Sequence, residues 1–529
     1  MKMVKSLILG SAAGLIAMSG AQAADLPVKA KAVEYVRICS LYGAGFYYIP
    51  GTDTCIKLGG YLRIDTTFNG TTYGAPAWNG DQGQGNRYRD YFVSRSRMAL
   101  TVDTRTATEY GVVRTFGQGD FQFDNFNNGS RNPALLATFN STQLSAAGGG
   151  YVAVEMVFLQ FAGFTFGKSA SAFATPWHGY PGNNNSFLMG GHDTVTGVNN
   201  IQYTAQFGNG VSGTIGLDDP TVFHRTAVFN TSTGIGAVGT TGNAYAGTHA
   251  PTIVGNIRVD QAWGLFQISG ALHEVNASYN TLTAATAAPT NLSETSGHPD
   301  SKWGGSVMAA LQIKNLPTGA GDDFKIDVTY AKGHTKQVIS TSGGSPSFAM
   351  FGGTGIAGGY QSVGLAATTD AVYLPGVGGT GGLQLTQAWG VRGAFNHNWD
   401  PYWSTSLWGS YAQVKYDGGA NDNLGAAGTT SAKGAYCAQF AVSHPGQTGV
   451  AGIGTYSCNP DFNVAQVGMV TRWTPVKGLT FSGEVGAFFL DQKMAGSSVF
   501  TATAPKPTAL YEFKDQSTVF LNVRAQRNF

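Results

Sequence analysis

The chain has 529 residues, and its 32 Lys/Arg and 30 Asp/Glu side chains leave a net charge of +2 at pH 7. This small charge gives no indication of nucleic acid or an anionic surface as a partner. Charged residues make up only 12% of the chain, against roughly 25% in an ordinary soluble domain. Beyond the N-terminus no apolar run approaches the roughly twenty residues that a transmembrane helix needs. Composition leaves two classes open: a membrane protein whose apolar residues alternate along strands, and a secreted β-rich adhesin.

The N-terminus has the pattern of an export signal. Lys2 and Lys5 are followed by a short apolar run, 7–18, and Ala21-Gln22-Ala23 fits a signal-peptidase site. The run is too short for a membrane anchor. We expect residues 1–23 to be a cleaved signal peptide, and residues 24–529 to form one exported domain.

Stretches of alternating polarity, bounded by turn residues, predict sixteen strands. They are 56–68, 92–104, 107–117, 152–162, 163–169, 198–207, 210–218, 252–261, 264–274, 303–314, 323–332, 386–398, 402–416, 463–473, 478–490 and 517–529. Short connections alternate with long ones, and the long ones include 69–91, 118–151, 170–197, 333–385 and 417–462. Strict short–long alternation is typical of an antiparallel up-and-down barrel with tight periplasmic turns and long outer loops. A β-sandwich or a β-solenoid has no reason to produce it.

The two faces of the strands differ in polarity. In the first strand Leu58, Leu62 and Ile64 share one parity, and Arg63 and Asp65 share the other. Charge recurs on the polar face of most strands, which a packed interior would rarely tolerate. Sixteen strands enclose a lumen that side chains alone cannot fill. We therefore expect a transmembrane barrel with a water-filled interior, which is a diffusion pore.

Four segments resemble a known family. They are 32–65 (AVEYVRICSLYGAGFYYIPGTDTC followed by IKLGGYLRID), 157–168 (VFLQFAGFTFGK), 458–479 (CNPDFNVAQVGMVTRWTPVKGL) and the C-terminal LNVRAQRNF. Together they are similar to the alphaproteobacterial general porins typified by those of Brucella and rhizobia. The resemblance implies a homotrimer of sixteen-stranded barrels in the outer membrane, passing small hydrophilic solutes and ions. It also implies an inward-folded third loop in each barrel.

Other motifs give little support to a different function. Gly353–Gly358 matches a dinucleotide fingerprint, but it lies in a long loop without the strand and helix that phosphate binding requires. The nine histidines show no metal-ligand spacing, so we expect neither cofactor nor metal. No Ser/His/Asp arrangement indicates an enzyme. An outer-membrane β-barrel lipase or protease remains the enzymatic alternative, beside the adhesin.

The four cysteines are expected to form two local disulfides, because an exported chain with an even cysteine count usually forms bridges. Three pairings are possible. Cys39 and Cys55 precede the first strand, whereas Cys437 and Cys458 share one long loop. Pairing across these groups would tie distant parts of the barrel together. We therefore expect Cys39–Cys55 and Cys437–Cys458.

The charges assigned to the lumen favour weak anion selectivity. The cations are Lys57, Arg63, Arg95, Arg97, Arg258, Lys325, Arg392 and Arg524, and the anions are Asp65, Asp103, Asp260, Asp327 and Glu484. Eight against five leaves an excess of three positive charges. A wide lumen screens charges over about 8–10 Å, and many of these groups can pair across neighbouring strands.

We expect segment 170–196 to form the constriction, facing an arginine-bearing wall. The expected constriction residues are Arg63, Arg95, Arg97, Arg258, Trp177, His178, His192 and Asp193. Asp193 is the only carboxylate in the segment's sequence, so a strong transverse field lacks its acidic side. Steric filtering should therefore dominate selection.

Overall fold

The computed structural model describes residues 37–70, 85–86, 91–124, 150–183, 186–193, 196–222, 224–279, 297–339, 347–374, 382–422, 431–446, 455–502 and 506–529. The predicted signal peptide and residues 24–36 lie outside these ranges, and so does most of the predicted loop 118–151.

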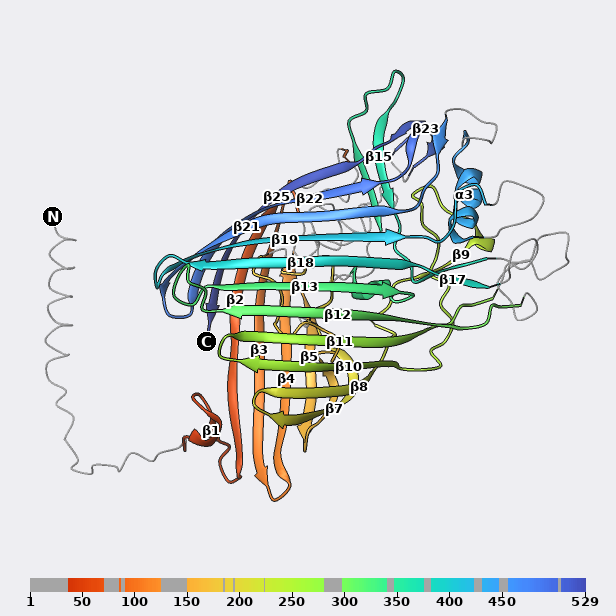
Figure 1. Ribbon diagram of the computed structural model, residues 1–529. Helices are drawn as coiled ribbons and strands as arrows, with labels where there is room; N and C mark the ends of the chain where they lie inside the picture. The colour runs from red at the N-terminus through yellow and green to blue at the C-terminus, as the bar shows by residue number, and fades with distance from the viewer. Residues whose placement is uncertain are drawn as a thin grey trace, which may run out of the picture.

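Within the described ranges, sixteen long strands form one closed antiparallel barrel (Figure 1). They are β2 (Thr54–Phe68), β3 (Phe92–Thr108), β4 (Gly111–Asp124), β5 (Tyr151–Phe161), β6 (Phe164–Ser169), β7 (Val198–Gly208), β8 (Val211–Asp218), β10 (Thr252–Gln261), β11 (Gly264–Val275), β12 (Lys302–Lys314), β13 (Asp323–Lys332), β18 (Gln387–Asn398), β19 (Trp403–Lys415), β21 (Phe462–Val476), β22 (Leu479–Gln492) and β25 (Gln516–Asn528). Each strand pairs with the next along this series, and β25 pairs with β2 from Asn528–Tyr61 to Leu521–Phe68. The predicted sixteen-stranded barrel is confirmed. Closure leaves no sheet edge, as a hydrocarbon environment requires.

The two faces of the barrel differ as the alternation predicts. Leu58, Ile64 and Leu521 are exposed on the outer face, whereas Asp65 and Asn522 at the alternate parity are buried inside. An apolar outer face and a polar interior are characteristic of transmembrane barrels. In the described part of the chain, no helix is long and apolar enough to cross a membrane.

Exposed aromatic side chains gather near the short turns. Phe207, Trp263, Trp399, Tyr402 and Trp473 all lie within a few residues of a turn and are at least 41% exposed. Their amphipathic rings suit the interface between hydrocarbon and water. This end of the barrel is opposite the long loops (Figure 1).

The turn chemistry explains the tight connections. In the β7–β8 turn, Asn209 has φ 49° and Gly210 has φ 74°, the left-handed pair that a two-residue hairpin needs. The β3–β4 turn falls at Glu109–Tyr110, so the predicted third strand, 107–117, is displaced. The threonines of the Thr104–Thr108 stretch continue β3. Gly117 and Gly119, which look like the start of a loop, lie within β4, where a side chain would meet open space.

The long connections and the segment before β2 contain secondary structure of their own, which the sequence patterns did not predict. The elements are β1 (Tyr47–Tyr48), β9 (Val228–Asn230), β14 (Phe348–Gly352), β15 (Gln361–Ala366), β16 (Ala371–Tyr373), β17 (Leu383–Leu385), β20 (Tyr456–Ser457), β23 (Ala495–Thr501), β24 (Thr508–Phe513), α3 (Ala432–Ser443) and the 3₁₀ turns Ser40–Tyr42, Thr231–Thr233 and Thr335–Gln337. Strands β14, β15, β24, β23 and β20 form one small sheet, and β17, β16 and β9 form another. Gly353–Gly358 follows β14, so a strand does precede it, but the next element is β15 rather than a helix.

These loops and the inner face of the barrel share one apolar core. Phe440 of α3 and Phe513 of β24 belong to the same buried cluster as Trp408 and Phe462 of the barrel wall. Leu188, from the segment between β6 and β7, joins them. Apolar loops therefore occupy part of the lumen that we expected to hold water throughout.

Two disulfides are present, with the pairing expected from the sequence. Cys39–Cys55 joins the segment before β1 to the start of β2. Cys437–Cys458 joins α3 to the residues that lead into β21. Both pairs are buried.

We expect Leu521→Arg to destabilise the barrel by about 2–4 kcal/mol, because the variant places a charge on the outer face near the middle of β25. Thr518→Arg is the matched control, since Thr518 has the opposite parity on the same strand. Urea unfolding in phospholipid vesicles measures both variants. Equal losses for the two would contradict the assignment of faces.

Candidate functional site

The segment between β6 and β7 runs into the barrel. Asn256 Nδ2 donates to Ala172 O at 2.6 Å, and Gln267 Nε2 donates to Ala174 O at 2.8 Å. Both donors lie on inner faces of the wall, in β10 and β11. We call residues 170–197 the inward loop.

Arg392 of β18 holds the middle of the inward loop. Its guanidinium is fully buried and bonds Asp327 of β13 at 3.0 Å. It also reaches Asp193 Oδ2 at 3.1 Å and donates to the carbonyl oxygens of Leu188 (3.2 Å) and His192 (3.0 Å). A buried cation is tolerated only when paired and hydrogen-bonded, and this cation draws its partners from both wall and loop.

Tyr180 adds a second contact with the same pair. Its hydroxyl donates to Asp327, and its ring centroid lies 4.9 Å from the Arg392 guanidinium carbon. Burial, followed by the charge of Asp327, raises the pKa of Tyr180 well above its usual value. The phenol is therefore a hydrogen-bond donor at neutral pH.

Glycines allow the loop to lie directly on the wall. A Cβ on Gly390 of β18 would lie 2.4 Å from Gly190 Cα, and one on Gly191 would lie 2.2 Å from Asp327 Oδ2. Gly190 also has φ +116°, which side chains other than glycine rarely adopt. A larger residue at any of these positions would push the loop into the lumen.

The tip of the loop is held by other strands. Arg472 of β21 donates to Pro181 O, and Asn183 Nδ2 donates to Ser482 Oγ of β22 at 2.9 Å. Arg524 of β25 donates to Asn183 O at 2.8 Å. The tip therefore lies across the lumen, anchored from β13 round to β25.

An open cavity of about 490 Å³ remains between the loop and the opposite wall. The lining residues that the structure describes include five arginines and two carboxylates: Arg63, Arg95, Arg97, Arg472, Arg524, Asp120 and Glu155. The loop contributes 178–183, Ser186, Phe187 and Thr196. The cavity is thus polar on both sides and positive on balance.

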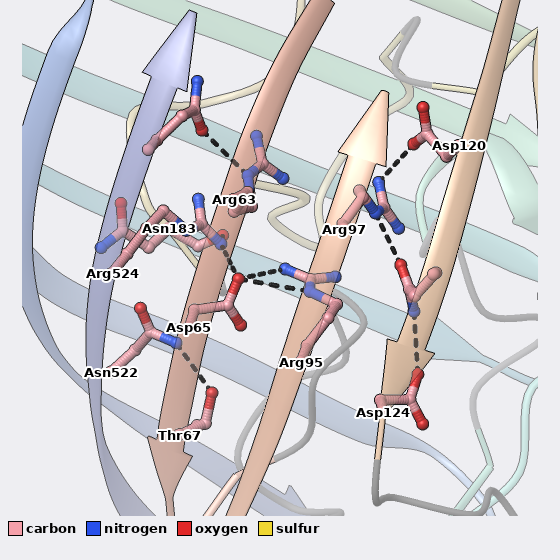
Figure 2. A network of polar contacts seen from close by, with 12 residues as sticks. Arg63, Asp65, Thr67, Arg95, Arg97, Asp120, Asp124, Asn183, Asn522 and Arg524 are labelled. Atoms are coloured by element: carbon pink, nitrogen blue, oxygen red, sulfur yellow. Dashed lines mark hydrogen bonds and ion pairs between the residues drawn. The ribbon is translucent and has the colours of Figure 1, made fainter. Parts of the chain in front are cut away.

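The wall of the cavity is a ladder of ion pairs across β25, β2, β3 and β4 (Figure 2). Arg95 Nη2 lies 2.8 Å from Asp65 Oδ2, and Arg524 Nη2 lies 3.3 Å from the same oxygen. Arg97 Nη1 lies 2.7 Å from Asp120 Oδ2 and 3.9 Å from Glu155 Oε1. These pairs fix the guanidinium groups along the cavity wall.

The structure brings together half of the predicted constriction residues. Arg63, Arg95, Arg97 and His178 line the cavity. The other four lie elsewhere. Trp177, His192 and Asp193 are buried where the inward loop packs against the wall and the outer loops. Arg258 pairs with Asp260 near the end of β10, beside a short turn.

Sequence reasoning missed Asp120, Glu155 and Arg472. Asp120 was assigned to a loop because the predicted third strand ended at 117, whereas β4 continues to Asp124. Extending the alternation of β4 would have put Asp120 on the polar face. Arg472 and Glu155 lie within predicted strands. Their positions in the alternation of polarity would have assigned them to the inner face.

Four buried histidines lie beside the inward loop. They are His192 in the loop, His224 after β8, His273 in β11 and His334 after β13. The rings of His273 and His334 stack at 4.5 Å, and His224 is 5.2 Å from His334 and 6.0 Å from His192. Burial lowers the pKa of His192 to about 3 and of His334 to about 4. No group of three or more His, Cys, Asp or Glu side chains in the described ranges is arranged to hold a metal ion.

The apolar outer face, the closed sheet and the charged interior define an outer-membrane β-barrel. The chain belongs to the Porin subfamily, which its residues 25–522 match. This membership confirms the resemblance seen in the sequence, and it indicates a channel rather than an enzyme.

Two relatives and one solved structure illustrate the similarity. Porin Omp2b of Brucella abortus is 34% identical over 266 residues, 49% of this chain and 63% of that protein. Porin Omp2a of Brucella melitensis is 38% identical over 223 residues, 41% of this chain and 56% of that protein. The chain thus aligns with less than two thirds of either relative. The outer membrane channel DcaP of Acinetobacter baumannii has a TM-score of 0.53 at 13% identity, covering 91% of this chain and 99% of that one, a likeness of fold alone.

We expect Gly390→Ala to displace the inward loop and raise single-channel conductance, because the added methyl group collides with Gly190. Overpacking of this kind costs typically about 1–3 kcal/mol. Gly393→Ala, on the same strand with no neighbour closer than 3.4 Å, should leave conductance unchanged. Planar-bilayer recordings distinguish the two, and an unchanged Gly390→Ala channel would contradict the contact.

We expect acid to loosen the inward loop. The pKa values of His192 and His334 are lowered in the folded state, so the packing is fully stable above about pH 6.5. It then loses stability as pH falls towards about 3, because only the unpacked state binds protons there. Protonated rings would face the cations Lys336, Arg225 and Arg392 as well as the carboxylates Asp218 and Asp370.

The measurement is conductance and open-channel noise between pH 7 and pH 4. His224→Gln/His334→Gln should flatten the response. His397→Gln is the control, since His397 contacts Asp322 at the turn end of the barrel. A pH response identical in all three proteins would contradict this origin.

Proposed function

We propose that this protein is a porin, a passive diffusion channel for small hydrophilic solutes and ions across the bacterial outer membrane. The cavity between the inward loop and the arginine wall carries the proposal. It is polar and open, whereas loops fill other parts of the lumen. Solutes would pass between Arg63, Arg95 and Arg97 on one side and residues 178–183, Ser186 and Phe187 on the other.

Selection should be mainly steric, with a weak preference for anions. Five arginines against two carboxylates line the described cavity. The loop side presents His178, Asn183 and Ser186 rather than acids, so the transverse field comes from the wall alone. Fixed charges of one sign in a pore favour the opposite ion.

We also propose a homotrimer, as the resemblance to Brucella porins implies. An apolar hollow on the outer face of β2 to β5 supports it, with Leu62, Met98, Phe121 and Val152 in its lining. Such a surface suits either lipid or another barrel. Cross-linking in detergent measures the subunit number.

The alternatives fit the site less well. The described cavity lining is dominated by five arginines, three of them ion-paired, together with amide and hydroxyl side chains, and such groups solvate ions rather than attack a bond. A secreted adhesin would have no use for a continuous apolar outer face. Recovery in the carbonate-soluble fraction without detergent would support an adhesin and sink the porin proposal.

In a salt gradient, we expect reversal potentials of the purified protein to show weak anion preference. Arg95→Ala/Arg97→Ala should reduce or abolish that preference, with only a modest change in conductance, because two wall charges are lost. Arg258→Ala is the control, since Arg258 lies away from the cavity. Strong cation preference in the unaltered protein would overturn the assignment.

A further inference from the structure

Arg63 differs from the other wall arginines in how it is held. Its Nε donates to Gln526 Oε1 at 2.9 Å, and its guanidinium carbon lies 4.4 Å from the centroid of the Tyr61 ring. Within the described residues, no partner is found for its two Nη groups, and no carboxylate lies within ion-pair distance. Figure 2 shows this guanidinium at the top of the ladder, away from Asp65. One edge of Arg63 is fixed, and the other faces the cavity.

Three carboxylates of the wall near Arg63 are already engaged by other arginines. Asp65 is shared by Arg95 and Arg524, and Asp120 and Glu155 both lie beside Arg97. One carboxylate therefore serves two guanidinium groups, and Arg63 is left as surplus positive charge. Within the described residues Arg63 forms no ion pair, and Asp65, the carboxylate on the same strand, is taken by Arg95 and Arg524.

A second observation is a buried donor without a partner on the strand next to Arg63. In the β2–β25 pairing Arg524 lies opposite Asp65, two residues along β2 from Arg63, and its side chain is only 8% exposed. Its Nε has no hydrogen-bond partner among the described residues. Asp65 Oδ1 beside it also lacks a hydrogen-bond partner among the described residues. Unpaired buried polar atoms are costly, and an anion bound at Arg63 would add acceptor oxygens close to both guanidinium groups.

We propose that the constriction contains a saturable binding site for small oxyanions, carboxylates or phosphate, centred on Arg63. This inference rests on the proposed function, because the ligand is a permeating solute. A guanidinium fork matches the paired oxygens of a carboxylate or phosphate and donates two parallel hydrogen bonds. Chloride cannot accept that pair in the same geometry. The cavity also presents Tyr61, His178 and Ser186, which can contact the remainder of a small organic anion.

A permeating anion would bind at this site transiently on its way through the channel. Flux requires an anion to bind strongly enough to enter and weakly enough to leave. One exposed edge of one guanidinium, beside water, meets both needs better than a closed arginine cage. Binding should weaken with salt, because screening shortens to about 3 Å at 1 M.

The test is inhibition of chloride current in planar bilayers at about 0.1 M KCl, with succinate, acetate or inorganic phosphate added. We expect a saturable decrease in current for the unaltered channel. Arg63→Gln should raise the half-inhibiting concentration at least about tenfold, as expected for loss of a charge-assisted pair. Arg63→Lys should show an intermediate value, because a point charge lacks the fork. Arg258→Gln should behave like the unaltered channel.

Each outcome has a distinct meaning. Saturation by both anion classes supports a general oxyanion site, and saturation by one class alone identifies its source. A current that falls without saturating, or a site that survives Arg63→Gln, overturns the inference while leaving the porin function intact. Failure to conduct chloride at all would overturn the proposed function instead. Arg63→Lys retains the charge, so it separates lost binding from a misfolded Gln variant.

Discussion

The position of the channel depends on the buried pair of Arg392 and Asp327. Alone, a cation in the wall of a barrel would be costly, and its partners must come from whatever packs against it. Here Asp327 supplies one charge from the wall, and the inward loop supplies Asp193 and two carbonyl oxygens. The Arg392 guanidinium therefore depends on the inward loop for hydrogen-bond acceptors, and the inward loop depends on Arg392 for its position. Because Gly190, Gly191 and Gly390 carry no Cβ, the loop can approach closely enough to complete it.

Fixing the loop on one wall divides the lumen. Leu188 and Met189 lie in the same apolar cluster as Val338 and Trp408, so the loop continues the core formed by the outer segments. A barrel of sixteen strands cannot be filled by its wall side chains alone. This chain fills part of the space with its own loops and leaves a polar passage beside β2, β3, β4 and β25. Apolar packing of the loops fills one side of the lumen, and the ion-paired wall keeps the other side polar and hydrated.

The barrel could be predicted from the sequence because the alternation of polar and apolar residues along a strand is visible in neighbouring residues. The order of the strands followed from the alternation of short and long connections, without any knowledge of contacts. The wall arginines 63, 95 and 97 were found for the same reason, since parity alone puts them inside. By contrast, His192 and Asp193 were expected at the constriction because they are polar. Their burial depends on Arg392, which is 199 residues from Asp193 in sequence, and on loop segments whose packing no local pattern encodes.

The form of the ladder explains why this wall can stay charged in a membrane protein. Arginine keeps its proton under all ordinary conditions and donates in a fixed plane, so neighbouring strands can hold it in register. Asp65 bridges Arg95 and Arg524 across three adjacent strands, β3, β2 and β25. The side chains are ordered before any solute arrives, so little conformational entropy is lost when an ion passes. An arginine wall of this kind places a positive field at a constant position, and Arg63, which forms no ion pair with a described residue, presents its guanidinium directly to the cavity.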